Sequence, residues 1–548
     1  MIRIDIRKRD GLARSGILTC EGGPVPQVPF PAVLETETVF PSLASRSGTN
    51  VPLSAPAELV KTYISRGPDQ PVTIHPALEN PAKSGDVVMV ANWHTALSNP
   101  RRYAEWLKNI REKTPADTLW YAPGSALPSN VHILCYSGFG LFDYIAADLK
   151  SAQGRFCTPE GEFPADAQKA GICACEGCRN GDLKLHNRLA LEGEIALVRY
   201  FIGQSKLREL VEARCRMNAN HVAIMRHLDV DYTGTEPYAP VARSGVMRAN
   251  SGESMQRVEV RRFAERLLTR YKPPKAMVAV LLPCSAKKPY SLSQSHRRFQ
   301  MAIAGRAHEL VITSPLGLVP RELECVYPAM HYDVPVTGYW DAEECAYISD
   351  IVARYLALHK YERVIAHLEG GALKVAEMAA ETCGITLEYS CREHPTGDEA
   401  LSQLSRALDS ERRVKDDRLH GMLSYQFGCD VDTKSMLSRG HFPELFYSKA
   451  NIQRFSIDTG NGLLRPTFEG WELIPQGYRV TISDFLPEGD VLVPGVVDAD
   501  PTIRDGDEVL VVGPKAMATG RAAMSAAEMK NSKRGVAVRV RKIKKLAI

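Results

Sequence analysis

The sequence predicts a multidomain α/β protein that ends in an all-β domain. The chain has 548 residues, whereas single domains mostly run to about 100–200 residues. Strand-like apolar runs alternate with helical periodicity in residues 86–136 and again in residues 273–415, which is the pattern of parallel βα units. From Trp471 onward, short strands separated by turns replace the helices. We therefore expect two α/β domains, at 1–235 and 273–415, and a β domain at 471–548.

The composition is that of a globular protein without a membrane segment. Apolar residues make up 44% of the chain and charged residues 24%, and no apolar run approaches the roughly 20 residues that span a bilayer. The segment Met1–Arg7 alternates like a strand and carries an acid, unlike a signal peptide. The net charge is only +4, so a nucleic-acid surface has to be a local patch. The 13 cysteines, an odd number, predict a reduced cytoplasm in which clustered thiols bind metal or catalyse.

The first domain, residues 1–235, is predicted to be a shortened or degenerate (β/α) barrel. A helix begins at Asn99-Pro100, because Tyr103, Leu107 and Ile110 keep helical spacing after it. A complete eight-fold barrel takes about 250 residues, so a full barrel of regular units does not fit easily. The predicted strands are Ile2–Ile6, Ala32–Val39, Asp86–Ala91, Thr118–Tyr121 and Val131–Tyr136.

One acidic residue in this domain follows a glycine-rich turn. The segment Ser137–Asp143 ends in Phe-Asp after two glycines. Asp143 can project into the mouth of a barrel. The residues alone leave a capping or salt-bridged aspartate equally open.

A compact cysteine motif predicts a metal site. Cys173, Cys175 and Cys178 lie close together, and His186 follows at the start of a helix-like run. Three thiolates and one imidazole complete a tetrahedral zinc shell, which leaves no position for water and so indicates a structural site. His221 and His227 are competing candidates for the fourth ligand.

The order Gly-x-x-x-Phe-Asp, Cys-x-Cys-x-x-Cys and His-Asn resembles the tRNA-guanine transglycosylase family over residues 1–235. The resemblance implies a (β/α)₈ barrel, a zinc ion on Cys173, Cys175, Cys178 and His186, and Asp143 as the nucleophile. The Cys178–His186 gap is shorter than in that family. No Asp-Ser-Gly motif supplies the family's second catalytic aspartate; the nearest stretch, residues 44–48, contains no acid. The domain is therefore expected to bind a modified base without exchanging it.

The segment 236–272 is predicted to be a linker with a basic helix. Val260, Phe263, Leu267 and Tyr271 keep helical spacing. The default interpretation of its arginines is a solvated helix face, and an RNA-facing surface is the alternative. These arginines are Arg243, Arg248, Arg257, Arg261, Arg262, Arg266 and Arg270.

The second α/β domain, residues 273–415, contains the segment Pro283–His296, which carries the predicted active site. It follows an apolar run that suits a buried strand, and ligands bind outside the carboxyl ends of strands in open α/β sheets. Further strands are predicted at Glu309–Thr313 and Arg363–Ala366, and the loops that follow them can converge on one crevice. A simple Ser/Pro turn before a basic helix start is the alternative to a site.

The run Pro-Cys-Ser-Ala-Lys-Lys-Pro-Tyr-Ser-x-Ser-x-Ser-His and the segment 314–324 resemble the archaeosine synthase family. The resemblance implies action on tRNA that carries 7-cyano-7-deazaguanine in its D-arm. It also implies that L-lysine is joined to the nitrile, that a radical S-adenosylmethionine partner enzyme splits the adduct, and that the chain forms a homodimer. The central domain further resembles the uracil-DNA glycosylase fold.

The chemistry of amine addition to a nitrile gives these residues candidate roles. Cys284 can attack first to form a thioimidate, because a thiolate is a strong nucleophile. Lys287 and Lys288 are expected to lower its pKa and to donate protons, and His296 is an acid–base candidate. A purely structural Cys284 stays open. The candidate substrate-binding residues are Ser285, Tyr290, Ser291, Ser293, Ser295, Asp333, Asp341 and Glu369.

The last segments are a connecting module at 416–470 and a β domain at 471–548. Asp505-Gly506 marks a turn between predicted strands. The segments Val493–Val496, Ala518–Ala522 and Lys533–Val538 resemble a PUA domain, a small RNA-binding barrel. No acid follows Glu528, and a basic tail of one sign favours phosphate contact over a merely solvated strand. The candidate RNA-binding residues are Lys533, Arg534, Arg539, Arg541 and Lys542.

Three functions fit these observations. The first is an archaeosine-type synthase that adds lysine to a nitrile base in tRNA. The second is a transglycosylase that inserts 7-cyano-7-deazaguanine through Asp143, against which the missing second aspartate argues. The third is a non-catalytic tRNA-binding subunit, against which the crowded 283–296 loop argues.

Overall fold

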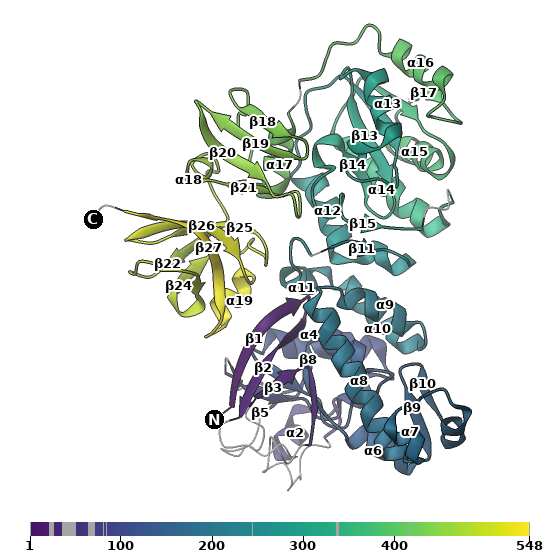
Figure 1. The fold of residues 1–548 in the computed structure, drawn as a ribbon, viewed down its shortest axis with the longest axis vertical. Coiled ribbons are helices and arrows are strands. Elements are labelled where there is room, and N and C mark those ends of the chain that lie inside the picture. Colours follow the sequence, from purple (N-terminus) through teal and green to yellow (C-terminus); the bar gives the residue numbers. More distant parts are fainter. Residues whose placement is uncertain are drawn as a thin grey trace.

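The molecule is elongated, with the N-terminal domain at one end and the central α/β domain at the other (Figure 1). The C-terminal β domain lies beside the junction between them. The structure is a computed structural model, and it describes residues 2–20, 27–35, 51–63, 72–79, 82–83, 85–243, 245–335, 339–415 and 417–546. Residues 44–48, and the part of the predicted strand beyond residue 35, lie outside these ranges.

The chain begins with an antiparallel sheet of β1 (Ile2–Asp10), β2 (Ala13–Cys20) and β3 (Gln27–Phe30). The alternation that predicts a strand at Ile2–Ile6 is confirmed. Gly11, at φ 64°, forms the turn between β1 and β2, where a left-handed conformation favours glycine. This turn also borders two pockets.

A second sheet forms a nearly closed, barrel-like arrangement. Its five strands are all parallel, in the order β4-β8-β7-β6-β5. The first of these strands in the chain, β4, thus pairs with the last, β8, as in a barrel. The strands are β4 (Ala32–Leu34), β5 (Val72–Thr73), β6 (Val87–Met89), β7 (Leu119–Tyr121) and β8 (Phe139–Asp143). The predicted strands at 86–91 and 118–121 are confirmed.

Helices cover this sheet, and one of them replaces a predicted strand. Helix α4 (Pro100–Glu112) begins where predicted, and the Asn99 side chain accepts a hydrogen bond from the Arg102 N–H at 3.2 Å. The strand prediction for Val131–Tyr136 is wrong, because these residues form helix α5. A short apolar run that is buried on all sides does not reveal its period, and α5 packs between α8 (Leu183–Gly203) and α9 (Leu207–Cys215).

The linker helix is α12 (Val258–Thr269), as predicted, but both interpretations of its arginines are wrong for Arg257 and Arg262. Arg257 is 3% exposed and its Nη2 lies 2.6 Å from Glu212 Oε2. Arg262 is 4% exposed and its Nε lies 2.7 Å from Glu236 Oε1. These arginines are buried in ion pairs, Arg257 with the barrel-like domain and Arg262 within the linker, rather than facing water or RNA.

The central domain contains a five-stranded sheet in the order β14-β13-β12-β16-β17. Strands β12 (Val278–Pro283), β13 (His308–Thr313), β16 (Arg363–His367) and β17 (Leu387–Cys391) are parallel, and β14 (Gly317–Pro320) is antiparallel at the edge. The three predicted strands are confirmed. The connecting helices are α13 (Gln294–Ile303), α14 (Ala342–Leu358), α15 (Gly370–Cys383) and α16 (Asp398–Ala407).

This strand order has a switch point at the strand that precedes the 283–296 loop. The chain passes from β12 to β13 on one side and later returns to β16 on the other side. Ligands in open α/β sheets bind at such a point, outside the carboxyl ends of the strands. The order of the strands therefore places the predicted active-site loop where the fold favours a ligand.

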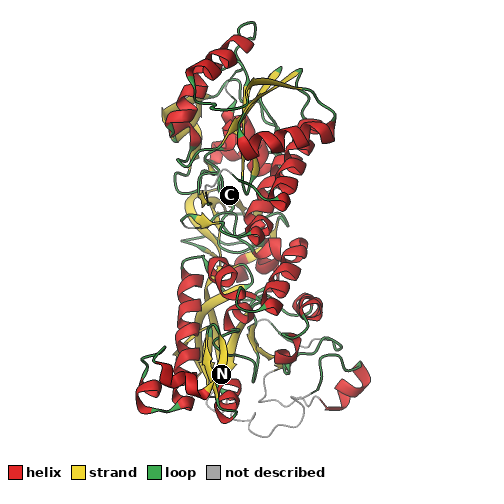
Figure 2. Ribbon diagram, turned by 90° about the vertical axis from the view of Figure 1, so that its right-hand side faces the viewer, coloured by secondary structure: helices red, strands yellow, loops and turns green. Residues whose placement is uncertain are grey.

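The connecting module has a helix, α17 (Arg418–Phe427), and an antiparallel sheet of β18 (Leu437–His441), β19 (Glu444–Lys449), β20 (Ile452–Ile457) and β21 (Leu464–Pro466). One hydrophobic core, which extends from Val241 to Val538, joins this module to the central and C-terminal domains. The barrel-like domain has a core of its own, built around Trp93 and Tyr103. Figure 2 shows the elongated molecule turned by 90° from the view of Figure 1.

The C-terminal domain is a six-stranded sheet in the order β23-β27-β26-β25-β22-β24. Its strands are β22 (Arg479–Ile482), β23 (Val491–Leu492), β24 (Val496–Ala499), β25 (Glu508–Val512), β26 (Ala516–Ala522) and β27 (Val536–Lys545). Helix α19 (Ala526–Asn531) faces the N-terminal sheet, because Glu528 pairs with Arg9 at 3.0 Å and with Arg14 at 2.7 Å. This contact ties the two ends of the chain together.

Candidate active site

The loop after β12 presents a cysteine at the open edge of the central sheet. Residues Val278–Leu282 are fully buried between β13 and β16, so the strand is fixed along its length. The chain leaves the sheet at Pro283, and the Cys284 side chain is exposed to solvent. A reactive thiol at the end of a buried strand is held in place and is still reachable.

Two neighbours act directly on the Cys284 thiol. Although the side chain reaches solvent, desolvation by the surrounding residues raises the pKa of Cys284, while a hydrogen bond with Thr313 and the charge of Lys288 lower it. Lys288 lowers the pKa as expected, but desolvation outweighs it and the net direction is upward. Lys287 is exposed and does not act on the thiol. The thiol is therefore mostly protonated at neutral pH, and a thiolate needs a base beside it.

Lys288 is the charged residue that acts on the thiol. Its Nζ lies 4.0 Å from the centre of the Tyr332 ring, a cation–π contact. Burial lowers the pKa of Lys288, against the opposing charges of Cys284 and Asp333. A lysine with a lowered pKa loses its proton more readily and can serve in general acid–base chemistry.

A chain of hydroxyl groups forms the floor beneath the thiol and the ammonium. The Tyr332 hydroxyl lies 2.7 Å from the Tyr290 hydroxyl and 2.5 Å from Thr313 Oγ1. Tyr290, Tyr332 and Thr313 are all buried. Sequence reasoning did not select Thr313 or assign Tyr332 a role, although both stand at strand ends, where polar groups meet in this class of sheet. We call Cys284, Lys288, Thr313, Tyr290 and Tyr332 the Cys284 cluster.

The predicted serines mostly stabilise the loop. Ser293 caps α13 by accepting a hydrogen bond from the His296 N–H at 3.2 Å, and its hydroxyl lies 3.2 Å from that of Ser295. The Ser291 hydroxyl donates to Glu324 at 2.6 Å, and that of Ser285 donates to the Lys287 carbonyl at 2.9 Å. These bonds hold the loop in one conformation.

His296 lies beneath the loop rather than at its open face. It is fully buried, and its Nδ1 accepts a hydrogen bond from Arg321 at 2.9 Å. Burial and the Arg321 charge lower the pKa of His296 to about 3. Such an imidazole stays neutral and cannot reach a substrate, so the structure does not favour the acid–base role considered for it.

Only one of the three candidate acids acts on the lysine. Asp333 is exposed in β15 (Tyr332–Asp333), and its charge is felt by Lys288. Asp341 caps α14 by accepting a hydrogen bond from the Glu344 N–H at 2.8 Å. Glu369 follows the end of β16 and accepts a hydrogen bond from the His394 N–H at 3.0 Å. Asp341 and Glu369 therefore accept backbone hydrogen bonds at a helix end and in a loop.

In the barrel-like domain, Asp143 stands at the carboxyl end of β8 but is locked in place. It is 1% exposed. Its oxygens accept hydrogen bonds from the Tyr121 hydroxyl at 2.7 Å, from the Gly124 N–H at 3.0 Å and from the Ile145 N–H at 3.1 Å. A carboxylate that is buried and bonded in this way serves to hold the β7 and β8 ends together.

The predicted metal ligands come together in one cluster. The ligand atoms of Cys173, Cys175, Cys178 and His186 all lie within 4.8 Å of one another. His186 Nδ1 lies 3.4 Å from Cys175 Sγ and 3.3 Å from Cys178 Sγ. Its other nitrogen, Nε2, lies 3.0 Å from the Cys157 carbonyl, the outer contact that usually orients a ligand histidine. The donor set therefore fits a metal ion.

The two competing histidines do not join the cluster. His221 is buried with its ring 5.3 Å from that of His132, and His227 is exposed on helix α10 (Ala219–Val230). A local feature instead explains the choice of His186. Gly177 lies so close to the start of α8 that a Cβ atom there would stand 2.3 Å from the His186 nitrogen. Glycine thus lets the cysteine turn close onto the histidine.

The candidate RNA-binding residues in and before β27 are largely exposed. Arg534, Arg539 and Lys542 are exposed, as is Lys533, whose backbone N–H donates to Asp117 at 3.0 Å. Arg541 differs, because its guanidinium pairs with the buried carboxylate of Glu508. A paired arginine is a weaker phosphate ligand than a free one, so Arg541 is the least suitable of the predicted set.

Among the residues that the structure describes, no helix is long and apolar enough to cross a membrane.

Family models match two parts of the chain. Residues 260–408 match "Domain of unknown function (DUF5591)", and residues 481–544 match "PUA domain". A solved protein of unknown function is 31% identical, covers 52% of this chain and 99% of its own length, and has a TM-score of 0.46.

Three relatives extend over most of the chain. "Archaeosine synthase subunit alpha" of Methanosarcina acetivorans is 38% identical, over 85% of this chain and 81% of its own length. "Archaeosine synthase" of Haloferax volcanii is 38% identical, over 84% of this chain and 82% of its own. A "tRNA-guanine(15) transglycosylase" of Methanobrevibacter smithii is 25% identical, over 76% of this chain and 66% of its own.

The fold, the PUA domain and these relatives define an RNA-modifying enzyme built from α/β domains and a C-terminal RNA-binding domain. The extent and identity of the matches make the assignment specific. The chain belongs to the archaeosine synthase family, and the predicted resemblance is confirmed.

Proposed function

We propose that this protein joins the amino group of free L-lysine to the nitrile of 7-cyano-7-deazaguanine in the D-arm of tRNA. The observation that carries the proposal is the Cys284 cluster, a reachable thiol beside a lysine of lowered pKa at the switch point of the central sheet. Its location in the segment matched by the relatives of the synthase family supports the assignment.

In the first step, Lys288 accepts the proton of the Cys284 thiol and the sulfur adds to the nitrile carbon. One C–S bond forms, one π bond of the C≡N group breaks, and Lys288 returns the proton to the nitrogen. A thiol whose pKa is raised by burial needs such a base. The product is a thioimidate, and Lys288 is neutral again.

In the second step, the neutral amino group of the lysine substrate attacks the same carbon. A C–N bond forms, the C–S bond breaks, and the departing sulfur takes the proton that the amine loses. The product is an amidine linked to lysine, and Cys284 returns to its thiol form. Asp333, exposed beside Lys288, is suited to hold a cationic group of the incoming lysine.

The barrel-like domain then serves to hold tRNA rather than to exchange a base. Asp143 is buried and bonded to three donors, so it lacks the free oxygen that attack on a ribose carbon needs. We regard the domain as a degenerate relative of the (β/α)₈ barrel, and the central domain as related to the uracil-DNA glycosylase fold. The tRNA would extend from the Cys284 cluster to the exposed residues of β27.

We assign zinc to the cysteine cluster, with Cys173, Cys175, Cys178 and His186 as its four ligands. Four protein ligands leave no open position, so the ion would be structural. Replacing Cys175 by Ser should remove the zinc from purified protein and destabilise it by about 4 kcal/mol or more, the range that loss of a metal reaches. Retention of one zinc per chain with unchanged stability would contradict the assignment.

Two partners complete the proposal. A radical S-adenosylmethionine enzyme would consume the lysine adduct, and the chain would act as a homodimer. Both follow from the family, and neither enters the chemistry of the Cys284 cluster.

The test is a mass measurement on nucleosides from tRNA that carries the nitrile base, after incubation with the protein and isotopically labelled lysine. The expected product is a labelled adduct whose mass equals that of the nitrile base plus lysine. A swapped base would show a transglycosylase, and an unchanged tRNA would show a binding subunit. Either result would overturn the proposal.

A further inference from the structure

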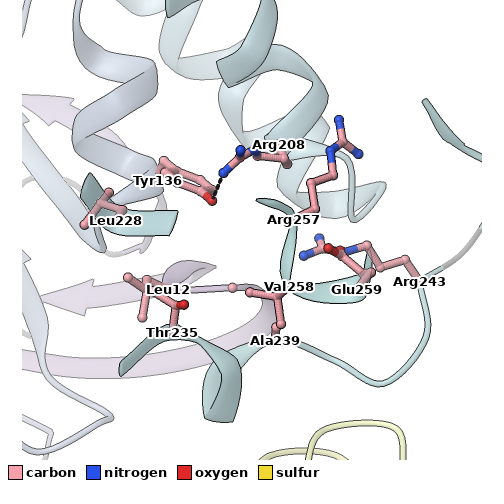
Figure 3. Close-up of a pocket in the computed structure, with 11 residues that line it drawn as sticks. Leu12, Tyr136, Arg208, Leu228, Thr235, Ala239, Arg243, Arg257, Val258 and Glu259 are labelled. Carbon is pink, nitrogen blue, oxygen red and sulfur yellow. Dashed lines mark hydrogen bonds and ion pairs between the residues drawn. The ribbon is translucent and has the colours of Figure 1, made fainter. Parts of the chain in front are cut away.

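Two pockets lie side by side at the amino-terminal end of the barrel-like sheet, away from Asp143. The first is lined by Leu12, Arg208, Arg243 and Arg257, among others (Figure 3). The second shares Leu12 with the first. We call the second the Arg111 pocket. Both pockets contain arginines, and they differ in whether acidic residues pair with those arginines.

In the first pocket, every arginine charge is matched. Arg208 bonds to both oxygens of Asp229, at 2.6 and 2.7 Å, and Figure 3 shows it reaching the Tyr136 hydroxyl as well. Arg257 pairs with Glu212 at 2.6 Å, and Arg243 pairs with Glu259 and Asp10. These ion pairs already explain the arginines, so this pocket calls for no ligand.

The Arg111 pocket differs because its lining carries two arginines and no acid. Its walls are formed by Leu12, Arg14, Arg111, Thr114, Pro115, Ala116, Thr118, Trp120, Ser137, Gly138 and Tyr238. The Tyr238 ring lies between the two guanidinium groups, 5.9 Å from that of Arg14 and 6.0 Å from that of Arg111. The pocket is therefore positive, with aromatic walls.

Among the residues that the structure describes, the Arg111 side chain has no hydrogen-bond or ion-pair partner, and its one close contact is the Tyr238 ring. Its Nη2 is buried without a partner. Burial lowers the pKa of Arg111 only to about 10, so the group stays charged at neutral pH. Asp231, the nearest acid whose charge it feels, is instead paired with Lys108 at 3.4 Å. A buried charge without a partner is costly and calls for a counterion.

Arg14 adds to this excess of positive charge. Its Nη2 pairs with Glu528, but the same carboxylate also pairs with Arg9. Glu528 is therefore shared by two arginines, on both of which the charge of Asp505 also acts. The Nε of Arg14 is buried without a partner, in the wall next to Arg111. Two guanidinium groups with unused N–H donors at one pocket match the geometry of an oxyanion.

We propose that the Arg111 pocket binds a phosphate group through Arg111 and Arg14. The group can come from free phosphate or from the tRNA backbone, which share this chemistry. The second source is within reach, because Asp117, between pocket residues Ala116 and Thr118, accepts a hydrogen bond from the backbone of Lys533 in the RNA-binding domain. Lys533 and Arg534 are exposed beside it.

The experiment compares thermal unfolding of the full chain with and without inorganic phosphate, for wild type, Arg111→Met and the control Arg102→Met. Arg102 is on the same helix, exposed, and paired with Glu105 at 3.0 Å. Phosphate stabilises all proteins somewhat by exclusion from their surface. The measured quantity is therefore the difference between variants in the rise of Tm that phosphate causes. We expect a larger rise in Tm for wild type and Arg102→Met than for Arg111→Met.

Removal of an uncompensated charge should also leave Arg111→Met at least as stable as wild type in phosphate-free buffer. Equal phosphate responses in wild type and Arg111→Met would overturn the proposal. If Arg111→Met does not fold, Arg111→Lys replaces it and should keep a weakened response; an unchanged one would overturn the proposal equally.

A second arm identifies the source of the phosphate group. If Arg111→Met also weakens tRNA binding tenfold or more, and inorganic phosphate competes with tRNA in wild type, the group belongs to the RNA. If tRNA binding is unchanged while the phosphate response is lost, the ligand is a free anion. Because this readout is binding, it stands apart from lysine transfer at Cys284.

Discussion

The barrel-like sheet and the central sheet are both built from parallel strands, and both end in a polar residue that the sequence marks as catalytic. Asp143 ends β8 in the first, and Cys284 follows β12 in the second. Asp143 is buried and bonded to three donors, whereas Cys284 is exposed and its nearest charged neighbour is a lysine of lowered pKa. The comparison teaches that a strand end locates a polar group, while its hydrogen bonds decide whether it can react.

The same distinction separates the two lysines of the motif. Lys288 lies on the Tyr332 ring and acts on the thiol, while its neighbour Lys287 is exposed and does not. Adjacent residues of the same type thus differ because only one of them points into the site. This pair provides matched controls for the predictions below.

The largest expected effect is at Cys284. Cys284→Ala and Cys284→Ser should both reduce lysine incorporation into nitrile-bearing tRNA to the background rate, because each removes the sulfur that forms the thioimidate. Unfolding temperatures should stay near that of wild type, since the side chain is exposed. Near-normal rates in both variants would contradict the thiol mechanism. Cys284 would then be as non-catalytic as Asp143.

The second effect is at Lys288. Lys288→Met should slow lysine incorporation by about 10²- to 10⁴-fold, the usual range for removal of an acid–base group. Lys287→Met, the matched control, should stay within about threefold of wild type, because Lys287 has no contact with the cluster that would affect catalysis. Similar losses in both variants would show that the lysines act through general charge.

The third prediction concerns Asp143, where stability rather than activity should change. Asp143→Asn loses acceptor capacity toward its three donors and should cost about 1–3 kcal/mol of unfolding free energy. The folded variant should add lysine at a rate close to that of wild type. A loss of activity comparable to that of Lys288→Met would restore a catalytic role to the barrel-like domain.

The smallest effect is a shift in the pH dependence of Cys284 alkylation, followed by peptide mass mapping after iodoacetamide treatment. Burial raises the pKa of Cys284, so alkylation should rise with pH about a midpoint above that of a free thiol. The Lys288 charge lowers this pKa, so Lys288→Met should move the midpoint to higher pH. Lys287→Met should leave it in place, and a shift in the opposite direction would contradict the pairing of Cys284 with Lys288.

Much of the architecture follows from short-range patterns in the sequence. The strands that flank the 283–296 loop were predicted, as was the helix that begins after Asn99. The metal cluster was also predictable from the cysteine motif, because three thiols in one turn converge almost independently of the rest of the fold. Side-chain spacing along one segment is sufficient for these features, since the backbone period fixes which residues share a face.

The errors lie where the outcome depends on what packs against a segment. Val131–Tyr136 became a helix because neighbouring helices bury all sides of it, and Arg257 and Arg262 became interior ion pairs because acids from other segments reach them. His296, a candidate catalyst, and most of the motif serines, candidate substrate-binding residues, make contacts that support the loop for the same reason.

The sequence by itself determined the order of the domains, the main strands, the metal cluster and the family of the enzyme. Only the tertiary structure decided which polar groups are open and which are locked. It surrounds Asp143 with donors from β7 and from the residues that follow Asp143, and it leaves Arg111 without a counterion among the residues that the structure describes. The physical reason is that charge and hydrogen-bond state depend on burial and on partners distant in the chain, which spacing along one segment does not record.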